Sequence, residues 1–177
     1  MRHGEDDDAR LGGWSNAGLS SIGIEQAKLA REEIIRAGYK ITHIFSSDLE
    51  RAKETAEIVA EGLNLKVAYV KEFRETNNGD LAGMTKEQAC KEYPGLYWSS
   101  LEWGQQYPNG ESPKSFYERV KSAWERFKKD TANVDGDVLL VTHSGVIDVI
   151  LCLENGLNYT NKHTTFRIGN AEIACVQ

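Results

Sequence analysis

The chain has 177 residues, of which 40% are hydrophobic and 27% are charged, and its formal net charge is −6. This length suits one globular domain, so we expect residues 1–177 to form a single domain. The negative charge argues against nucleic-acid binding, which requires a basic face. The sequence also lacks an apolar run near the roughly 20 residues of a membrane span, so we expect no membrane association.

The three cysteines, Cys90, Cys152 and Cys175, are widely spaced and form no C-x-x-C pair. This pattern indicates neither a disulfide framework nor a zinc site. The chain does not open with a charged segment followed by an apolar one, so secretion has no support. We therefore expect reduced thiols and a cytoplasmic protein.

Apolar periodicity predicts helices that alternate with short apolar strands. The first expected helix begins at Ser20 or Ser21 and ends at Gly38, and the second covers 48–61. Two more follow the capping residues Thr85 and Ser112, and the last covers 146–154. The expected strands cover 41–45, 66–70 and 138–141, with one or two closing strands over 166–168 and 171–176. This alternation is typical of a single three-layer α/β domain, with a mostly parallel central sheet and helices on both faces.

Two candidate site residues follow expected strands directly. Arg51 comes shortly after the strand at 41–45, and His143 comes after the strand at 138–141. Ligands of such sheets bind beyond the carboxyl ends of the strands. We therefore expect Arg51 and His143 to converge at one edge of the sheet.

Four short motifs along the chain resemble one protein family. They are Arg2-His3-Gly4-Glu5, SSDLERA at 46–52, ETNNG at 75–79 and VTHSG at 141–145. In this order they resemble the histidine phosphatase superfamily, which includes the cofactor-dependent phosphoglycerate mutases, and the likeness covers nearly the whole chain. The resemblance implies a phosphoglycerate-mutase-like fold and phosphoryl transfer that needs neither a metal nor another cofactor.

The resemblance also implies roles for five residues. His3 matches the nucleophile that becomes a phosphohistidine, Glu75 matches the general acid, and the phosphate ligands are Arg2, Arg51 and His143. These residue types suit the reaction, because a phosphomonoester spreads negative charge over three oxygens and arginine can bind two of them at once. A neutral imidazole can attack phosphorus if its other ring nitrogen has a partner, which we expect to be a backbone carbonyl.

Nearby acids leave alternatives to Glu75. Glu72 and Asp80 are the nearest, and Glu75 is favoured because Gly79 and Gly83 complete the family's E-x-x-x-G-x-x-x-G pattern. The acidic run at 6–8 is interpreted as a solvated loop rather than a magnesium site.

Three aromatic residues bear on the substrate, but the sequence does not fix their role. Trp98, Trp103 and Tyr107 either line an apolar pocket for the leaving group or fill core, and the sequence favours neither interpretation. The expected substrate is a small phosphorylated metabolite, and a homodimer is an open alternative to a monomer.

Two departures from the family bear directly on function. Family members begin with a strand that leads into the Arg-His-Gly motif, whereas only Met1 precedes Arg2 here. We interpret the first strand as truncated, which puts the activity of the 177-residue form in question. The chain also lacks room for the mutases' longer substrate-binding insertion, so a phosphatase is favoured over a phosphoglycerate mutase. A non-catalytic module that binds phosphorylated ligands is the alternative from another class.

Overall fold

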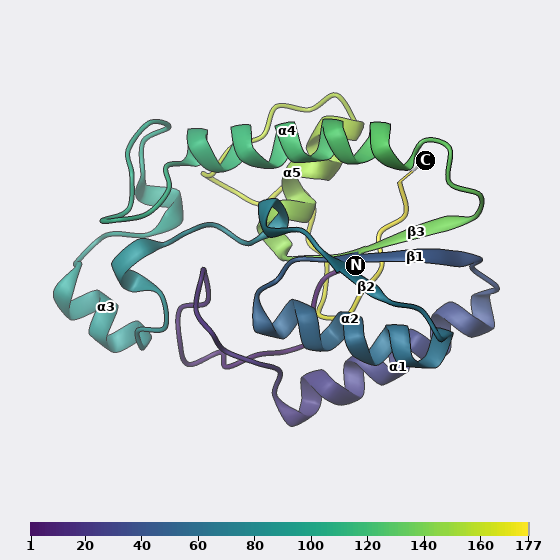
Figure 1. The fold of residues 1–177 in the computed structure, drawn as a ribbon. Coiled ribbons are helices and arrows are strands. Elements are labelled where there is room, and N and C mark those ends of the chain that lie inside the picture. The colour runs from purple at the N-terminus through teal and green to yellow at the C-terminus, as the bar shows by residue number, and fades with distance from the viewer. Residues whose placement is uncertain (177) are drawn as a thin grey trace.

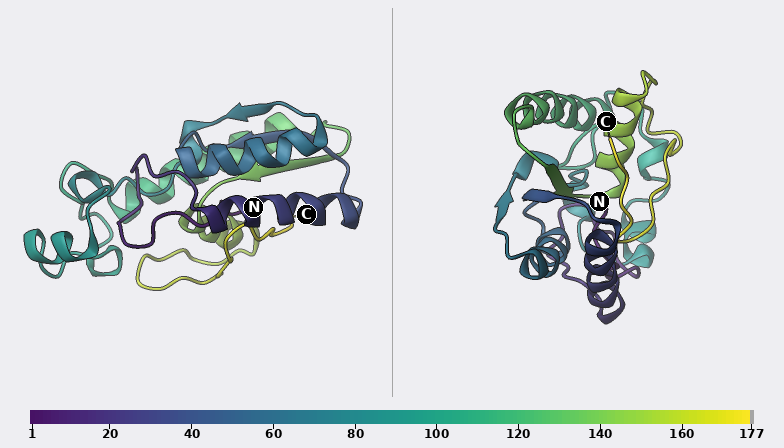
Figure 2. Two further views of the ribbon diagram at one scale, coloured as in Figure 1. Left: turned by 90° about the horizontal axis from the view of Figure 1, so that it is seen from below. Right: turned by 90° about the vertical axis from the view of Figure 1, so that its right-hand side faces the viewer.

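A computed structural model describes residues 1–176 and has three layers (Figures 1 and 2). The central sheet is parallel, in the order β2-β1-β3, and consists of β1 (Ile41–Ser46), β2 (Val67–Tyr69) and β3 (Asp137–Val141). One face is covered by α1 (Ser21–Ala37) and α2 (Glu50–Leu63), and the other by α4 (Pro113–Thr131) and α5 (Ser144–Glu154). The short helix α3 (Lys86–Glu92) lies in a segment that projects from the three layers at one end of the molecule (Figure 1). The predicted α/β fold is confirmed.

The predicted helix boundaries rest on capping groups that the structure contains. The Ser20 side chain accepts the Gly23 amide at the start of α1, and Gly38 ends the helix with a left-handed φ of 76°. Capping boxes begin α3 at Thr85 and α4 at Ser112. These side chains satisfy backbone amides that have no partner within the helix, which is why the helices begin at these residues.

Residues 1–3 run alongside β3 and place the Arg-His-Gly motif at the sheet. The Met1 amino group donates to the Leu140 carbonyl at 2.9 Å, and the His3 amide donates to the Thr142 carbonyl at 2.9 Å. The Thr142 amide in turn donates to the Met1 carbonyl at 2.9 Å, so the segment forms a short parallel ladder with the end of β3. His3 is thereby held at the carboxyl edge of the sheet.

The prediction of closing strands over 166–168 and 171–176 was wrong. Within residues 1–176 these segments are irregular, although the Arg2 amide donates to the Glu172 carbonyl and the Ala171 amide to the His3 carbonyl. Ala171 has a φ of 58°, which an extended strand does not allow.

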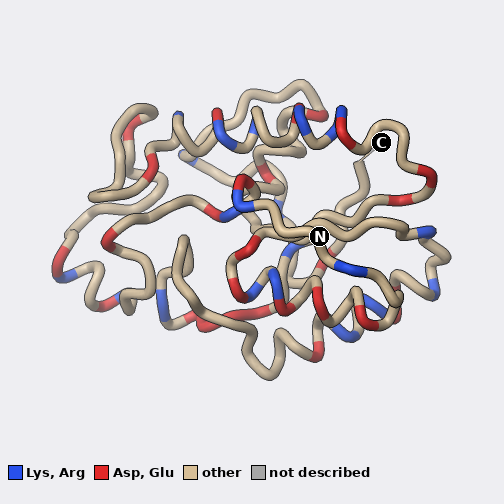
Figure 3. Tube along the Cα trace, in the orientation of Figure 1, with Lys and Arg blue, Asp and Glu red and all other residues tan. Residues whose placement is uncertain are grey.

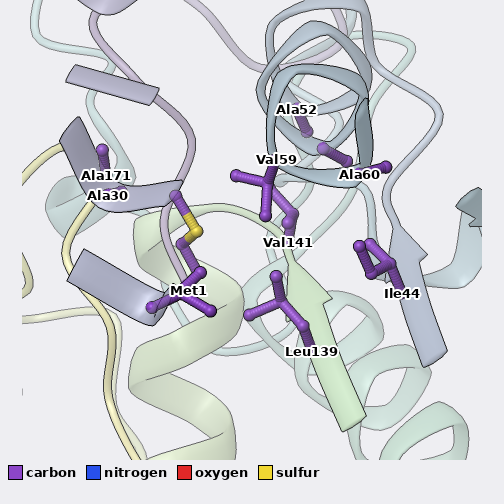
Figure 4. Packing of buried hydrophobic residues seen from close by; sticks show 11 residues of the cluster. Met1, Ala30, Ile44, Ala52, Val59, Ala60, Leu139, Val141 and Ala171 are labelled. Atoms are coloured by element: carbon purple, nitrogen blue, oxygen red, sulfur yellow. The ribbon is translucent and has the colours of Figure 1, made fainter. Parts of the chain in front are cut away.

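Two apolar clusters hold the layers together. The cluster under α1 and α2 contains Met1, Ile44, Val59 and Val141 (Figure 4). The other joins α4 and α5, and it confirms the predicted core stripe of α4, whose members are Phe116, Val120, Ala123, Trp124 and Phe127. Truncating a buried phenylalanine such as Phe116 costs about 3–5 kcal/mol of stability, so this cluster fixes α5 firmly against α4.

Charged residues of both signs are interspersed along the helices and the loops (Figure 3). None of the helices within residues 1–176 combines the length and the apolar character that crossing a bilayer requires.

Candidate active site

His3 is buried at the carboxyl edge of the sheet with a defined tautomer. Its Nδ1 lies 2.6 Å from the Gly4 carbonyl oxygen, which can only accept, so Nδ1 carries the proton and Nε2 is unprotonated. The expected backbone partner is thus found. Burial, the largest cause, and the positive charges of Arg51 and Arg2 together lower the pKa of His3 to about 3, against the effect of the Gly4 carbonyl. The imidazole is therefore neutral near pH 7, as a nucleophile must be.

The backbone around His3 is held by close packing of glycines and by side-chain hydrogen bonds. A Cβ on Gly4 would meet the Gly23 carbonyl oxygen at 2.5 Å, so only glycine lets this segment contact the start of α1. The Gly4 amide also donates to the Thr55 hydroxyl of α2 at 3.0 Å. Both contacts fix the position of the imidazole relative to α1 and α2.

Arg51 lies in the first turn of α2 and is 2% exposed. Its Nε is 3.3 Å from His3 Nε2 and 3.4 Å from a carboxylate oxygen of Asp6, and its Nη2 donates to the Gly13 carbonyl at 2.9 Å. The interpretation of the 6–8 run as a solvated loop was therefore wrong for Asp6. The buried guanidinium attracts this carboxylate across 45 residues of sequence, a contact that the local sequence does not reveal.

His143 precedes α5 directly and is fully buried beside His3, with the two ring centroids 5.0 Å apart. Its Nε2 lies 2.8 Å from the Ser47 hydroxyl, which also accepts the Leu49 amide. If this hydroxyl donates to Nε2, the proton of His143 stays on Nδ1 and can be donated to a ligand. Burial holds the pKa of His143 well below its usual value, and the charge of Arg51 adds to the effect.

Three buried nitrogens of this group have no hydrogen-bond partner among residues 1–176. They are Arg2 Nε, Arg51 Nη1 and His143 Nδ1. Arg2 is anchored through its Nη1, which donates to the Ile168 carbonyl at 3.0 Å. A buried donor without a partner costs about 1–3 kcal/mol, so three of them beside one imidazole indicate a site built for an anion. We call Arg2, His3, Arg51 and His143 the phosphate cradle.

Glu75 lies at the edge of the phosphate cradle. One of its carboxylate oxygens accepts the Gly145 amide at 3.1 Å, and the other accepts the Thr76 amide at 3.0 Å. Its negative charge acts on Arg51 and partly offsets the lowering of the Arg51 pKa by burial. Arg119 of α4 holds the segment by donating to the carbonyls of Glu75 and of two preceding residues at 2.7–3.1 Å.

The two alternative acids are engaged elsewhere. Glu72 lies 3.7 Å from Arg126, and Asp80 accepts the Asn109 amide group at 2.9 Å. The structure thus brings together all five residues that the motifs indicated. Of Glu72, Glu75 and Asp80, Glu75 is the one that lies beside the cradle, where Asp6 also pairs with Arg51.

A cavity of about 720 Å³ has Glu75 in its lining. Trp98 and Tyr107 line it, stacked on each other with ring centroids 6.0 Å apart, whereas Trp103 lies outside it and packs on Tyr117. Both interpretations of the aromatic residues therefore hold in part. This volume lies within the range of about 300–1,000 Å³ that is usual for small-molecule sites.

Residues 1–176 contain no group of three or more His, Cys, Asp or Glu side chains arranged to hold a metal ion. The charges available in the phosphate cradle are those of its two arginines.

The fold and this geometry define a three-layer α/β protein with an anion site at the carboxyl edge of its sheet. Comparison with known proteins identifies the family: the sequence profile of the histidine phosphatase superfamily (branch 1) matches residues 1–177. The chain belongs to this superfamily.

Several relatives are similar over much of the chain. It is 36% identical to phosphoglycerate mutase of Schizosaccharomyces pombe over 67% of its own length, and it spans only 60% of that protein. It is 30% identical to phosphoserine phosphatase 1 of Hydrogenobacter thermophilus, with 99% of the chain and 83% of that protein covered. A mycobacterial glucosyl-3-phosphoglycerate phosphatase superposes with a TM-score of 0.78 at 31% identity, covering 96% of this chain and 84% of that one.

Proposed function

We propose that the protein hydrolyses small phosphate monoesters through a phosphohistidine at His3. The observation that carries the proposal is the set of three unpartnered buried nitrogens, on Arg2, Arg51 and His143, around a neutral imidazole. A transferring phosphoryl group has three oxygens whose charge must be stabilised. Similarity to a phosphoserine phosphatase and to a glucosyl-3-phosphoglycerate phosphatase supports the same class of activity.

In the proposed first step the Nε2 lone pair of His3 attacks phosphorus, and the bond from phosphorus to the ester oxygen breaks. Glu75 gives its proton to the departing alkoxide, and Nδ1 keeps its hydrogen bond to the Gly4 carbonyl. In the second step the Glu75 carboxylate takes a proton from water, which attacks the phosphohistidine and releases phosphate. Arg2 and Arg51 stabilise the oxygens in both transition states through fixed charges.

A phosphoglycerate mutase activity is the alternative within the family, and similarity to the mutase of S. pombe favours it. A mutase would return the phosphoryl group from His3 to a hydroxyl of the substrate rather than to water. The two activities are separated by assaying phosphate release and phosphoglycerate isomerisation on the same sample. We also propose a cytoplasmic location, because all three cysteines are free thiols.

The proposal is tested by trapping the intermediate. Quenching turnover of a labelled ester should give a phosphoprotein that is labile in acid and stable in base, and turnover should persist in strong chelators. Vanadate should inhibit, because it mimics the transferring group. Loss of turnover in chelator, restored by added metal, would contradict the proposal.

Substitution of the nucleophile provides the control. His3→Ala should lose about 10⁴-fold or more of the turnover and all of the label. His43→Ala, at an exposed histidine of β1, should keep both. A labelled His3→Ala protein would show that another residue carries the phosphoryl group.

A further inference from the structure

The cavity beside Glu75 has one wall that carries positive charge. We call Lys162, His163 and Arg167, which lie on the segment after α5, the basic wall. The acidic residues that line the cavity are Glu75, assigned above as the proton donor, and Asp148. In a chain with a net charge of −6, this wall is a local concentration of positive charge.

Asp148 serves the loop rather than the cavity. It is 3% exposed, and one of its carboxylate oxygens accepts the amides of Thr165 at 3.1 Å and Phe166 at 2.8 Å. Its position on α5 therefore fixes the loop against the helix. Because the Asp148 carboxylate accepts hydrogen bonds from backbone amides, it repels an anion in the cavity less than a free carboxylate would.

Arg167 lies between two residues that are tied to the site. Phe166 is held by Asp148, and the carbonyl of Ile168 accepts Nη1 of Arg2, a member of the phosphate cradle. Farther along the loop, the buried Asn161 side chain donates to two backbone carbonyls at 2.7 and 2.9 Å. Because the loop is held at these points, it loses less conformational entropy when Arg167 binds a ligand than a free loop would.

Of the two permanent cations of the wall, only one is free. Lys162 donates to the Leu101 carbonyl at 2.8 Å and lies 3.5 Å from Glu102. Arg167 is exposed and has neither an ion pair nor a side-chain hydrogen bond among residues 1–176. Its guanidinium keeps all its donors for a ligand, in a planar arrangement that matches a carboxylate or a phosphate.

We propose that Arg167 binds a second anionic group, a carboxylate or another phosphate, on the alcohol portion of the substrate. The inference rests on the proposed phosphomonoesterase activity, because it requires the first phosphate to occupy the phosphate cradle. The leaving group then extends past Glu75 into the cavity and ends in an anion at Arg167. Arg167 is thus a specificity-determining residue.

A matched pair of esters tests this inference. D-3-phosphoglycerate and D-glycerol 3-phosphate (sn-glycerol 1-phosphate) have the same carbon chain and the same configuration at carbon 2, and they differ only in a carboxylate in place of a hydroxymethyl group. The wild type should prefer the carboxylate by about 10-fold or more in kcat/KM, chiefly through KM, as expected for one charge-assisted contact. Propane-1,3-diol bisphosphate compared with propyl phosphate distinguishes a second phosphate from a carboxylate as the preferred anion.

Substitution then assigns the preference to Arg167. Arg167→Gln should reduce the preference to about one while it leaves glycerol 3-phosphate turnover within about two-fold. Arg36→Gln, at an exposed arginine of α1, should keep the preference. A wild type that turns over p-nitrophenyl phosphate but has no preference within either pair, or a preference that survives in Arg167→Gln, would overturn the inference and leave the proposed function intact.

The same experiment separates the two proposals if no ester is hydrolysed. That result would remove the proposed function, and calorimetric titration of 3-phosphoglycerate and glycerol 3-phosphate would then decide the inference. Tighter binding of the carboxylate, lost in Arg167→Gln, would support it. Equal affinities would overturn it.

Discussion

The phosphate cradle and the adjoining cavity are built in different ways. Three of the four cradle side chains, those of His3, Arg51 and His143, are buried, and three cradle nitrogens have no hydrogen-bond partner among residues 1–176. The cavity is lined mainly by irregular segments, and its cations are exposed. Chemistry shared by a family requires fixed charge and excluded water, whereas recognition of the alcohol requires a surface that can vary. The predictions below test this division, because changes in the cradle should affect every ester and changes at its edge only some.

Replacement of the cradle arginines should have the largest effect. Arg51→Lys and Arg2→Lys should each lower kcat/KM by about 10²–10³-fold for every ester, because a lysine point charge cannot replace two directed donors. Arg36→Lys on the exposed face of α1 serves as the control. Steady-state assays on one aryl and one alkyl ester are sufficient. Near-normal rates in Arg51→Lys would mean that its charge alone is needed.

Glu75→Gln should distinguish esters by their leaving groups. With an aryl phosphate the transfer to His3 needs little protonation, so rapid mixing should show a burst of about one equivalent and then slow turnover. With an alkyl phosphate the burst should vanish, and the rate should fall about 10²-fold. Glu72→Gln is the matched control, because its carboxylate pairs with Arg126 instead. Unchanged turnover of both esters by Glu75→Gln would move the acid elsewhere.

Gly145→Ala tests the position of Glu75 without altering the acid itself. A Cβ at this position would lie 2.5 Å from a Glu75 carboxylate oxygen, so the carboxylate must move while the backbone stays. We expect alkyl ester turnover to fall about 10-fold and aryl transfer to change little. Gly104→Ala, where no atom lies within 4 Å of the added Cβ, should be neutral. A similar loss on both esters would indicate a distorted cradle.

A further effect concerns stability rather than rate, and it should appear only below neutral pH. Because burial lowers the pKa of His3 to about 3, the unfolded chain binds a proton that the folded chain excludes as the pH falls below about 6.5. Stability should therefore be constant with respect to His3 above pH 6.5 and decline toward pH 3, by an amount of about 5 kcal/mol in total.

Denaturant titration of the wild type and His3→Gln across pH 4–8 measures this contribution. The free energy of unfolding of the variant should fall less steeply below pH 6.5, because His143 is then the one cradle histidine whose protonation destabilises the folded state. Parallel pH profiles for the two proteins would show that His3 is accessible to solvent protons in the folded state.

The cradle could be predicted from the sequence, whereas its supports could not. Arg51 and His143 follow strands of a parallel sheet, and topology alone brings them to one edge. Asp6 and Arg119 are common residue types whose contacts, with Arg51 and with the Glu75 segment, join distant parts of the chain. The local sequence contains no sign of these contacts.

The predicted bounds of two elements differ from the observed ones for similar reasons. Helix α2 was predicted from residue 48 but begins at Glu50, because Leu49 has an extended backbone with a ψ of 137°. The Asp48 carboxylate, outside the helix, binds Arg74 at 2.6 Å. The closing strands were predicted from apolar composition, which does not register the left-handed backbone of Ala171. In both cases a tertiary contact or a single dihedral angle overrides a local pattern.

The cradle also joins two distant parts of the chain. His3 and Arg2 are bonded to Ala171, Glu172 and Ile168, about 170 residues farther along. During synthesis at about 5–20 residues per second, a nascent chain can assemble α1, β1 and α2 long before those partners leave the ribosome. The anion site is therefore completed after release of the carboxyl-terminal segment, so a ribosome-stalled chain that ends before residue 168 should be inactive even if its helices have formed.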